Sequence, residues 1–376
     1  MNNPFAIFNS WTASNICVAL LLLIVAVAAY RMSGNEYWRL AWREIASSKT
    51  ALISAAILGL YVLVALADSI GWRNPVLNPE TGQPMRHPAT GKIVYDSGAS
   101  ALDRLLRPLA SRKEVTYSAP LARTQHTPVT KVAADGTVRR VKPLLKYPGK
   151  HLCGTDIIGD DVLVLAIKSI RTALIVGVLT TLIAIPFALF FGLTSGYFGG
   201  ILDTIVQFLC TLLNSIPTIL LVASIMLIFQ KGLPQLCFAM GIGSWTLLCR
   251  LIRGETLKLR EAEFTQAAIA LGTPAWKIIL RHILPNVMHI FLIHAVLRFS
   301  GLVLTEATLT YLGLGVGADT LSWGTMINDA RTELTRDPII WWKLSTAFCF
   351  LVGLVLPANI FGDAVRDALD PKLRTH

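Results

Sequence analysis

The chain has 376 residues, of which 53% are hydrophobic and 15% are charged, whereas an average soluble protein is nearer ~25% charged. This balance excludes an ordinary soluble domain and indicates that most of the chain lies in lipid. The net charge of +11 does not indicate nucleic-acid binding, because the basic residues occur in loops between apolar stretches rather than along one soluble face. Membrane topology and lipid head groups account for that charge instead.

Several stretches meet or approach the roughly 20 mainly apolar residues that a membrane-spanning helix needs. In chain order they are residues 11–30, 51–67, 172–202, 204–230, 232–249, 283–312 and 344–362. The first resembles a signal peptide, but no positive charge precedes it. Basic residues follow it instead, so the positive-inside rule places the next segment in the cytoplasm and the N-terminus outside. Alternation of the spans then places the C-terminus in the cytoplasm.

Residues 71–165 are rich in proline, glycine, threonine and charge, with turn-like runs at 78–82 and 134–137. Alternation places this basic loop outside, because the positive-inside rule is weak for loops longer than ~60 residues. A loop of this length is usually functional or disordered, and we expect a partly ordered external cap. The span that follows is expected to end in a glycine-rich turn at 192–200. Pro186 and Pro217 lie inside spans, where they either shape a pathway or serve bundle packing.

The stretch 283–312 carries two charges, Arg298 and Glu306, and an ionisable residue within a span is by default a functional candidate. The two are eight residues apart, roughly 12 Å along a helix, which is too far for a direct pair. Glu306 either faces a water-filled path or has a structural role, and the structural role is favoured. His289 and His294 are expected to be packing residues, and the cysteines show neither metal-ligand nor disulfide spacing.

Residues 250–285 form a polar interruption between spans, and their pattern predicts two helices joined by a short turn. An apolar stripe is expected at helical spacing, made of Leu257, Phe264, Ala268 and Leu271. Gly272 suits the C-terminal cap position, and Thr273 can cap the next helix with Pro274 at its first position. Small side chains gather before the turn, namely Ala262, Ala267, Ala268 and Ala270. This small-residue face either seats in a partner's groove or packs on the chain's own helices.

The hairpin contains Gln266-Ala267-Ala268, then Gly272, then Ile283-Leu284-Pro285. This pattern resembles the EAA loop of binding-protein-dependent ABC importer permeases, E-A-A-x3-G-x9-I-x-L-P. The wider stretch is similar to the C-type subunit of the dipeptide/oligopeptide branch. The chain departs from the family pattern at Gln266, where a glutamate is usual, and at His282, where an isoleucine is usual. Gln266 therefore removes a charge that could pair across an ATPase interface, although Glu261, Glu263 or Arg260 could compensate.

Further motifs in the family's order flank the hairpin. They are Gly154-Thr155-Asp156 with Gly159, Asp161 and Val162; Glu306-Ala307-Thr308-Leu309; Leu312-Gly313-Leu314-Gly315; Ser322-Trp323-Gly324; and the segment from Gly362 to Pro371. Asp160 stands where the family has arginine. The resemblance covers about residues 154–373 and the span 51–67. It implies an all-α polytopic membrane helix bundle with the type I ABC importer transmembrane fold, in which a six-span core and an extra N-terminal helix give about seven spans.

The implied organisation has five parts. They are an extra N-terminal transmembrane helix (1–30), a cytoplasmic linker and first core span (31–70), a long periplasmic loop (71–165), the importer transmembrane domain (166–365) with the coupling hairpin 250–285, and a cytoplasmic tail (366–376). The resemblance assigns the ATPase-coupling loop to Glu261, Gln266, Ala267, Ala268, Gly272, Ile283, Leu284 and Pro285. It assigns no catalytic residue, and Arg298 and Glu306 are candidates for the translocation path or for a structural role.

The resemblance implies a permease subunit that forms half of a pathway for di- or oligopeptides across the inner membrane. The chain contains no G-x-x-x-x-G-K-[S/T] phosphate loop, so ATP and Mg²⁺ are expected in separate ATPase subunits, and this chain is expected to bind no cofactor or metal and to catalyse no reaction. The implied partners are a second permease subunit, two ABC ATPase subunits, a periplasmic or surface solute-binding protein, the peptide and membrane lipid. Nickel chelates, glutathione and antimicrobial peptides remain alternative cargoes. An ion-coupled secondary transporter is the alternative class, and it would need buried proton relays and repeated halves.

Overall fold

The computed structural model describes residues 36–73, 75–76, 84–85, 98–132, 138–229, 231–317 and 319–369, together with scattered positions between 11 and 30. Helices dominate, and the described strands form two small antiparallel sheets. The chain divides into two compact units. The first unit comprises Met1–Leu40, Gly59–Arg171 and Glu333–Thr346, and the second unit comprises Ala41–Leu58, Thr172–Thr332 and Ala347–His376.

Five described helices are long and apolar enough to cross a membrane. They are α3 (Lys49–Ser69), α5 (Val162–Phe198), α8 (Leu233–Glu261), α11 (Leu284–Tyr311) and α13 (Trp342–Leu369). A sixth span results if α6 (Gly200–Ser215) and α7 (Thr218–Ile228) are counted as one, although they are bent by 89°. The predicted all-α membrane bundle is confirmed, whereas the predicted N-terminal span lies largely outside the described residues.

The predicted span 204–230 is two helices rather than one. Ile216 has an extended backbone (φ −93°, ψ 128°), and Pro217, which has no N–H to donate, is the N-cap residue of α7. A residue before proline is disfavoured in the helical region, so the chain turns at this dipeptide. Pro217 is therefore a helix boundary, while Pro186 lies within the continuous helix α5.

The glycine-rich turn predicted at 192–200 is wrong over most of its length, because α5 remains helical to Phe198. The two glycines inside the helix serve close packing on α8 instead. A Cβ on Gly192 would lie 2.9 Å from the carbonyl oxygen of Cys249, and one on Gly196 would lie 2.7 Å from the Cβ of Thr256. Only glycine lets the two backbones approach this closely, as is common where membrane helices cross.

The predicted external loop, 71–165, contains more regular structure than its composition indicated. In the first unit, β1 (Gly71–Trp72) pairs with β2 (Ala99–Ser100), and α4 (Ala101–Ala110) follows directly. A second hairpin pairs β3 (Val129–Val132) with β4 (Val138–Val141). Helix α4 begins with a capping box, in which the side chains of Ser100 and Asp103 each accept from the other residue's backbone N–H. The turn-like runs at 78–82 and 134–137 lie outside the described residues.

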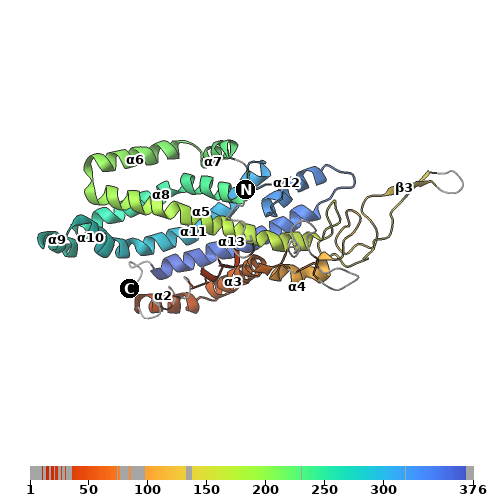
Figure 1. Cartoon of the computed structure of the whole chain (residues 1–376), viewed down its shortest axis with the longest axis horizontal. Helices are drawn as coiled ribbons and strands as arrows, with labels where there is room; N and C mark the ends of the chain where they lie inside the picture. Colours follow the sequence, from red (N-terminus) through yellow and green to blue (C-terminus); the bar gives the residue numbers. More distant parts are fainter. Residues whose placement is uncertain are drawn as a thin grey trace. The chain divides into compact units, whose positions relative to one another are not determined.

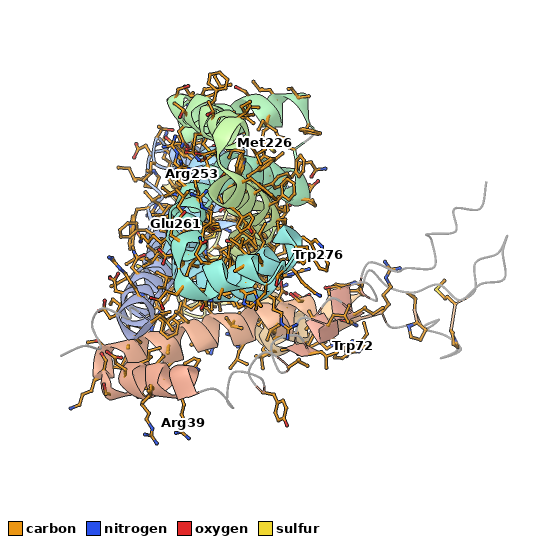
Figure 2. All side chains as sticks on the ribbon, turned by 90° about the vertical axis from the view of Figure 1, so that its left-hand side faces the viewer. Arg39, Trp72, Met226, Arg253, Glu261 and Trp276 are labelled. Carbon is orange, nitrogen blue, oxygen red and sulfur yellow. The ribbon has the colours of Figure 1, made fainter. Side chains whose placement is uncertain are left out.

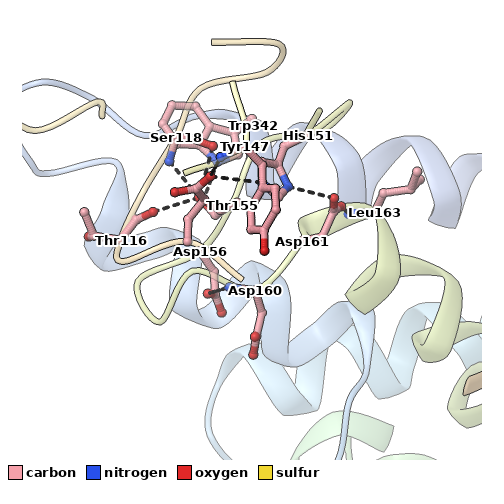
Figure 3. Close-up of polar contacts among 11 residues, drawn as sticks. Thr116, Ser118, Tyr147, His151, Thr155, Asp156, Asp160, Asp161, Leu163 and Trp342 are labelled. Atoms are coloured by element: carbon pink, nitrogen blue, oxygen red, sulfur yellow. Dashed lines mark hydrogen bonds and ion pairs between the residues drawn. The ribbon is translucent and has the colours of Figure 1, made fainter. Parts of the chain in front are cut away.

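The motif around Gly154-Thr155-Asp156 forms the turn that leads into α5 (Figure 3). The Thr155 hydroxyl donates to the carbonyl of Thr116 (2.9 Å) and accepts from the backbone N–H of Ser118 (2.7 Å). The Asp156 carboxylate accepts from the backbone N–H groups of Ile158 and Asp160 at 3.0 and 2.9 Å. These bonds satisfy the polar groups of a tight turn and hold it against an earlier, irregular segment of the loop.

The same turn explains two further motif positions. The Asp161 carboxylate accepts from the backbone N–H of Leu163 (2.9 Å) at the start of α5, and it contacts Nδ1 of the buried His151 (3.0 Å; Figure 3). Gly159 has φ 81°, and a Cβ there would overlap the carbonyl of Glu114, so the turn requires glycine at this position. The motif therefore orders the start of α5, and its residues are structural.

The second unit carries the predicted hairpin. After α8 the chain forms α9 (Glu263–Ala270), α10 (Ala275–Ile278) and a π-helical turn (Ile279–Ile283) that continues into α11. Figure 1 shows α9 and α10 together at one end of this unit, where α8 ends and α11 begins. Helix α12 (Trp323–Glu333) follows α11 after a loop. The remaining described helix, α2 (Glu36–Ser47), precedes α3.

Candidate coupling hairpin and intramembrane polar residues

The junction between α8 and α9 is a capped bend. Helix α8 ends at Glu261 because Ala262 has an extended backbone (φ −67°, ψ 145°). Two side chains from α9 then reach back to carbonyls in the last turn of α8. The Thr265 hydroxyl donates to the carbonyl of Leu259 (2.7 Å), and Gln266 Nε2 donates to the carbonyl of Arg260 (2.9 Å). An ionised glutamate has no N–H to donate, so the glutamine gives this position a capping bond that a glutamate there could not make.

Replacing Thr265 by valine is expected to destabilise this junction by about 1 kcal/mol, because the buried side chain keeps its shape but loses its hydroxyl donor. The measurement is the thermal unfolding temperature of the purified chain, together with the rate of limited proteolysis near residue 262. Thr265→Ser is the matched control, since it keeps the hydroxyl and should behave like the parent. Equal unfolding temperatures for the valine and serine variants would contradict the capping role.

The turn after α9 closes as a Schellman motif around Gly272, as the sequence predicts for a glycine cap. The Thr273 N–H donates to the carbonyl of Ala268 (3.0 Å), and the Gly272 N–H donates to that of Ile269 (2.9 Å). Gly272 has φ 73°, the left-handed conformation that glycine adopts without strain. The predicted capping by Thr273 is wrong, because Pro274 itself is the N-cap residue and α10 has no side-chain cap.

One face of the hairpin is buried in the helix bundle. Ala268, Ile278, Ile279 and Ile283 belong to a single apolar cluster that also contains residues of α5, α6 and α8. The predicted stripe is wrong, because Phe264 and Leu271 are exposed while Ala268 is buried. The bend at Ala262 separates Leu257 from the rest of the stripe, and Leu271 is the C-cap residue beyond the last turn of α9. The small-residue face is divided in the same way, with Ala268 packed on the chain's own helices and Ala267 exposed.

Five large apolar side chains of the described hairpin are exposed. They are Phe264, Ile269, Leu271, Trp276 and Leu280, and we call this set the outer face. Figure 2 looks onto this end of the unit, with Trp276 and Glu261 labelled. Exposed charges accompany it, including Glu263 and Lys277. Aromatic and aliphatic side chains among charged neighbours are typical of a protein interface.

The end of α8 is tied to neighbouring helices by two arginines. Arg253 makes a bidentate ion pair with Asp203 of α6, with N to O distances of 2.5 and 2.6 Å. Arg260 donates to the carbonyl of Tyr197 in α5 (3.3 Å) and pairs with Glu261 at 2.9 Å. Glu261 remains mostly exposed, so its carboxylate is available to a partner at the cost of the Arg260 pair. The Asp203–Arg253 pair was not predicted, because residues 50 positions apart carry no local sequence signal.

The Ile283-Leu284-Pro285 segment joins the hairpin to α11 without a break. The Leu284 N–H donates to the carbonyl of Ile279, the spacing of a π-helix. Pro285 lies in the first turn of α11, where its missing N–H is tolerated. Ile283 is fully buried, whereas Pro285 is exposed. The motif therefore marks the mechanical link between the hairpin and the next span.

The two intramembrane charges lie apart from the hairpin contacts and apart from each other. Glu306 is buried, accepts from the hydroxyl of Thr310 (2.8 Å) and also hydrogen-bonds Ser322 in the loop after α11. These contacts favour the structural role for Glu306. Arg298 lies beside a cavity lined in part by His294 and Ser244. Thr310 lies one helical turn from Glu306, whereas Ser322 lies in the loop beyond the helix, so the contact with Ser322 could not be predicted from local spacing.

The glycine run after α11, Gly313, Gly315 and Gly317, forms a turn at the end of a span. The Gly313 N–H donates to the carbonyl of Thr310 (2.9 Å), and the Leu314 N–H donates to that of Leu309 (2.9 Å), which is again a Schellman motif. A Cβ on Gly315 would overlap the Thr310 side chain, so the loop folds back tightly on the helix end.

The sequence matches the family model of the binding-protein-dependent transport system inner membrane component over residues 184–375. Residues 36–85 match the N-terminal transmembrane domain of oligopeptide transport permease C. The chain therefore belongs to the family of binding-protein-dependent transport system inner membrane components. It is a permease subunit, a transport component and a multi-pass membrane protein, and the sequence-based prediction of the type I ABC importer membrane fold is confirmed.

Named relatives agree with this assignment. An oligopeptide transport system permease protein OppC from Haemophilus influenzae is 35% identical over 66% of this chain and 78% of the relative. A Bacillus subtilis protein of the same name is 36% identical over 61% of this chain and 74% of the relative. The glutathione transport system permease protein GsiD of Pectobacterium atrosepticum is 33% identical over 60% of this chain and 74% of the relative.

Proposed function

We propose that this chain forms half of the translocation pathway of an ATP-driven importer for di- or oligopeptides. The relatives named as oligopeptide permeases support this cargo. Glutathione is the second candidate, supported by the relative named as a glutathione permease. Nickel chelates and antimicrobial peptides are further cargoes for the same pathway.

The observation that carries the proposal is the two-faced hairpin. Its inner face belongs to the cluster that holds α5, α6 and α8 together, and its outer face presents exposed apolar side chains around Leu271 and Trp276. An ATPase subunit that buries the outer face would move the spans together with the hairpin. The inner side chains are close-packed among α5, α6 and α8, so the hairpin cannot shift without moving these helices. The coupling residues are those in which the family motif and this geometry coincide: Glu261, Gln266, Ala267, Ala268, Gly272, Ile283, Leu284 and Pro285.

The remaining partners follow from this mechanism. A second permease subunit completes the pathway, two ABC ATPase subunits bind ATP and Mg²⁺, and a periplasmic or surface solute-binding protein delivers the cargo. This chain itself holds no cofactor and performs no covalent chemistry. The hairpin faces the cytoplasm with the C-terminus, and the N-terminus lies outside. ATP binding and a loaded binding protein each favour one state of the pathway and so shift its population.

The test is to co-express the chain with the products of its neighbouring genes, purify it by a tag on this chain, and reconstitute the complex in proteoliposomes. Co-purification of an ATPase whose activity rises with a peptide-loaded binding protein, together with ATP-dependent peptide uptake, is expected. Uptake that follows an ion gradient without ATP would instead establish the secondary-transporter class. A chain that purifies with no ATPase would refute the proposal.

A further inference from the structure

A polar stripe runs along one face of α11. Its members recur every three or four residues and are His294, Arg298, Gly301, Thr305 and Thr308. This spacing places them on one side of the helix. Each of them is exposed or partly exposed, whereas Val303 on another face is fully buried. A polar face that is left open on a membrane span is expected to border water or a partner rather than lipid.

A small cavity lies beside this stripe, between α5, α8 and α11. Its volume is about 20 Å³, which is room for roughly one water molecule. The polar side chains of its lining are Thr181, Ser244, His294 and Arg298, and the others are Ala184, Ile185, Leu248, Ala295 and Leu302. None of these lining residues is acidic. The cavity lining thus carries no negative charge, and it carries the positive charge of the Arg298 guanidinium group.

The charge of Arg298 has no counter-ion among the described residues. Glu306 is roughly 12 Å further along the same helix and is held by other partners. The hydroxyls of Thr181 and Ser244 donate to carbonyls of their own helices, at 2.7 and 3.4 Å. Arg298 and His294 are therefore the side chains that can donate into the cavity. A charged side chain at this depth is costly in lipid unless water or an anion compensates it.

We infer that Arg298 binds the free carboxylate of the transported peptide at a midpoint of the translocation path, with His294 as a second donor. The inference rests on the proposed function. A guanidinium group matches a carboxylate with two parallel hydrogen bonds. Every unmodified peptide carries a C-terminal carboxylate whatever its side chains, so one such binding site can serve peptides of varied sequence. The cavity is too small for a carboxylate in this conformation, and it must widen when the spans separate during transport.

The experiment compares one tripeptide in two forms, with a free carboxyl or an amidated C-terminus, in proteoliposomes that contain the full complex. Both forms are supplied at concentrations that saturate the binding protein, so that its own affinity for each does not decide the rate. Arg298→Gln is expected to lower uptake of the free acid about tenfold or more and to leave uptake of the amide within about twofold. Arg298→Lys should retain part of the free-acid uptake, since lysine keeps the positive charge but lacks the two parallel N–H donors of the guanidinium group. Lys231→Gln, which removes an exposed charge in the loop before α8, is the matched control and should transport both forms normally.

The outcomes separate this inference from the proposed function. Equal loss of acid and amide uptake in Arg298→Gln would overturn it and would indicate that Arg298 pairs with an acidic side chain of the second permease subunit. Unchanged uptake of the acid would overturn it as well. In both cases peptide import by the parent complex would still support the proposed function. A parent complex that hydrolyses ATP but imports neither peptide form would refute the peptide cargo itself.

Discussion

Substitution of Leu271 by aspartate is expected to lower ATP-driven uptake about a hundredfold or more while leaving the chain folded in the membrane. Leu271 is 85% exposed, so the isolated fold has little to lose from the change. In the assembled importer the same side chain would be covered by the ATPase. A carboxylate buried without a partner in an apolar interface costs roughly 3–5 kcal/mol, which is enough to dissociate a protein interface of ordinary affinity. The measurements are the amount of ATPase that co-purifies with the chain and the initial rate of uptake.

Leu144→Asp is the matched control for this prediction. Leu144 is 76% exposed and lies in the first unit, in the long loop, so the same chemical change there should leave the ATPase bound. Trp276→Ala should weaken the ATPase contact as well, since exposed tryptophans often carry much of the binding energy of an interface. Normal recovery of the ATPase with Leu271→Asp would show that the outer face is not the docking surface.

Replacement of Gly272 by valine is expected to abolish transport with membrane insertion intact. The left-handed conformation at φ 73° costs a side-chain-bearing residue about 1–2 kcal/mol, and a β-branched residue more. Among the described residues, no atom beyond the two chain neighbours lies within 4 Å of the position a Cβ would take, so the penalty comes from the backbone alone. To relieve it, the turn must open, and the outer face then loses the fixed geometry that α9 and α10 give it. Uptake and ATPase stimulation by the loaded binding protein are the measurements.

Gly272→Asn separates backbone strain from side-chain bulk. Asparagine adopts the left-handed conformation more readily than other residues with a side chain, and the site is open, so this variant should retain most of the transport. If valine and asparagine were equally inactive, the space around residue 272 in the assembled complex would be the cause. Full activity of the valine variant would show that the Schellman turn is dispensable for coupling.

The sequence was sufficient where the signal is local. The glycine cap at Gly272 and the turn after α11 follow from residues a few positions apart, and the structure has both. The apolar lengths of the spans likewise predicted the membrane bundle. The stripe failed because it assumed one unbroken helix, whereas the extended residue Ala262 separates Leu257 from Phe264, and Leu271 is the C-cap residue beyond the end of α9. The extended conformation of an alanine has no signature that periodicity detects.

Long-range contacts account for the rest of what the sequence could not provide. Gly192 and Gly196 were expected to form a turn because glycine often does, yet their role depends on α8, more than 50 residues later. The partner of Asp203 is equally distant in sequence. The apolar cluster formed with α5, α6 and α8 decides which hairpin residues are buried. The outer face could therefore be identified only from the folded chain.

The glycine contacts between α5 and α8 have a consequence for stiffness. Where Gly192 and Gly196 bring α5 this close to α8, few flexible side-chain atoms lie between the helices to absorb a displacement of one against the other. A push on α9 is thus resisted by α8 and α5 together, and through Asp203 by α6 as well. If a flexible loop joined the hairpin to the spans instead, the loop would bend and the spans would move less. A movement that an ATPase imposes on the hairpin would therefore displace α5, α6 and α8 together, because the contacts among these three helices hold them to one another.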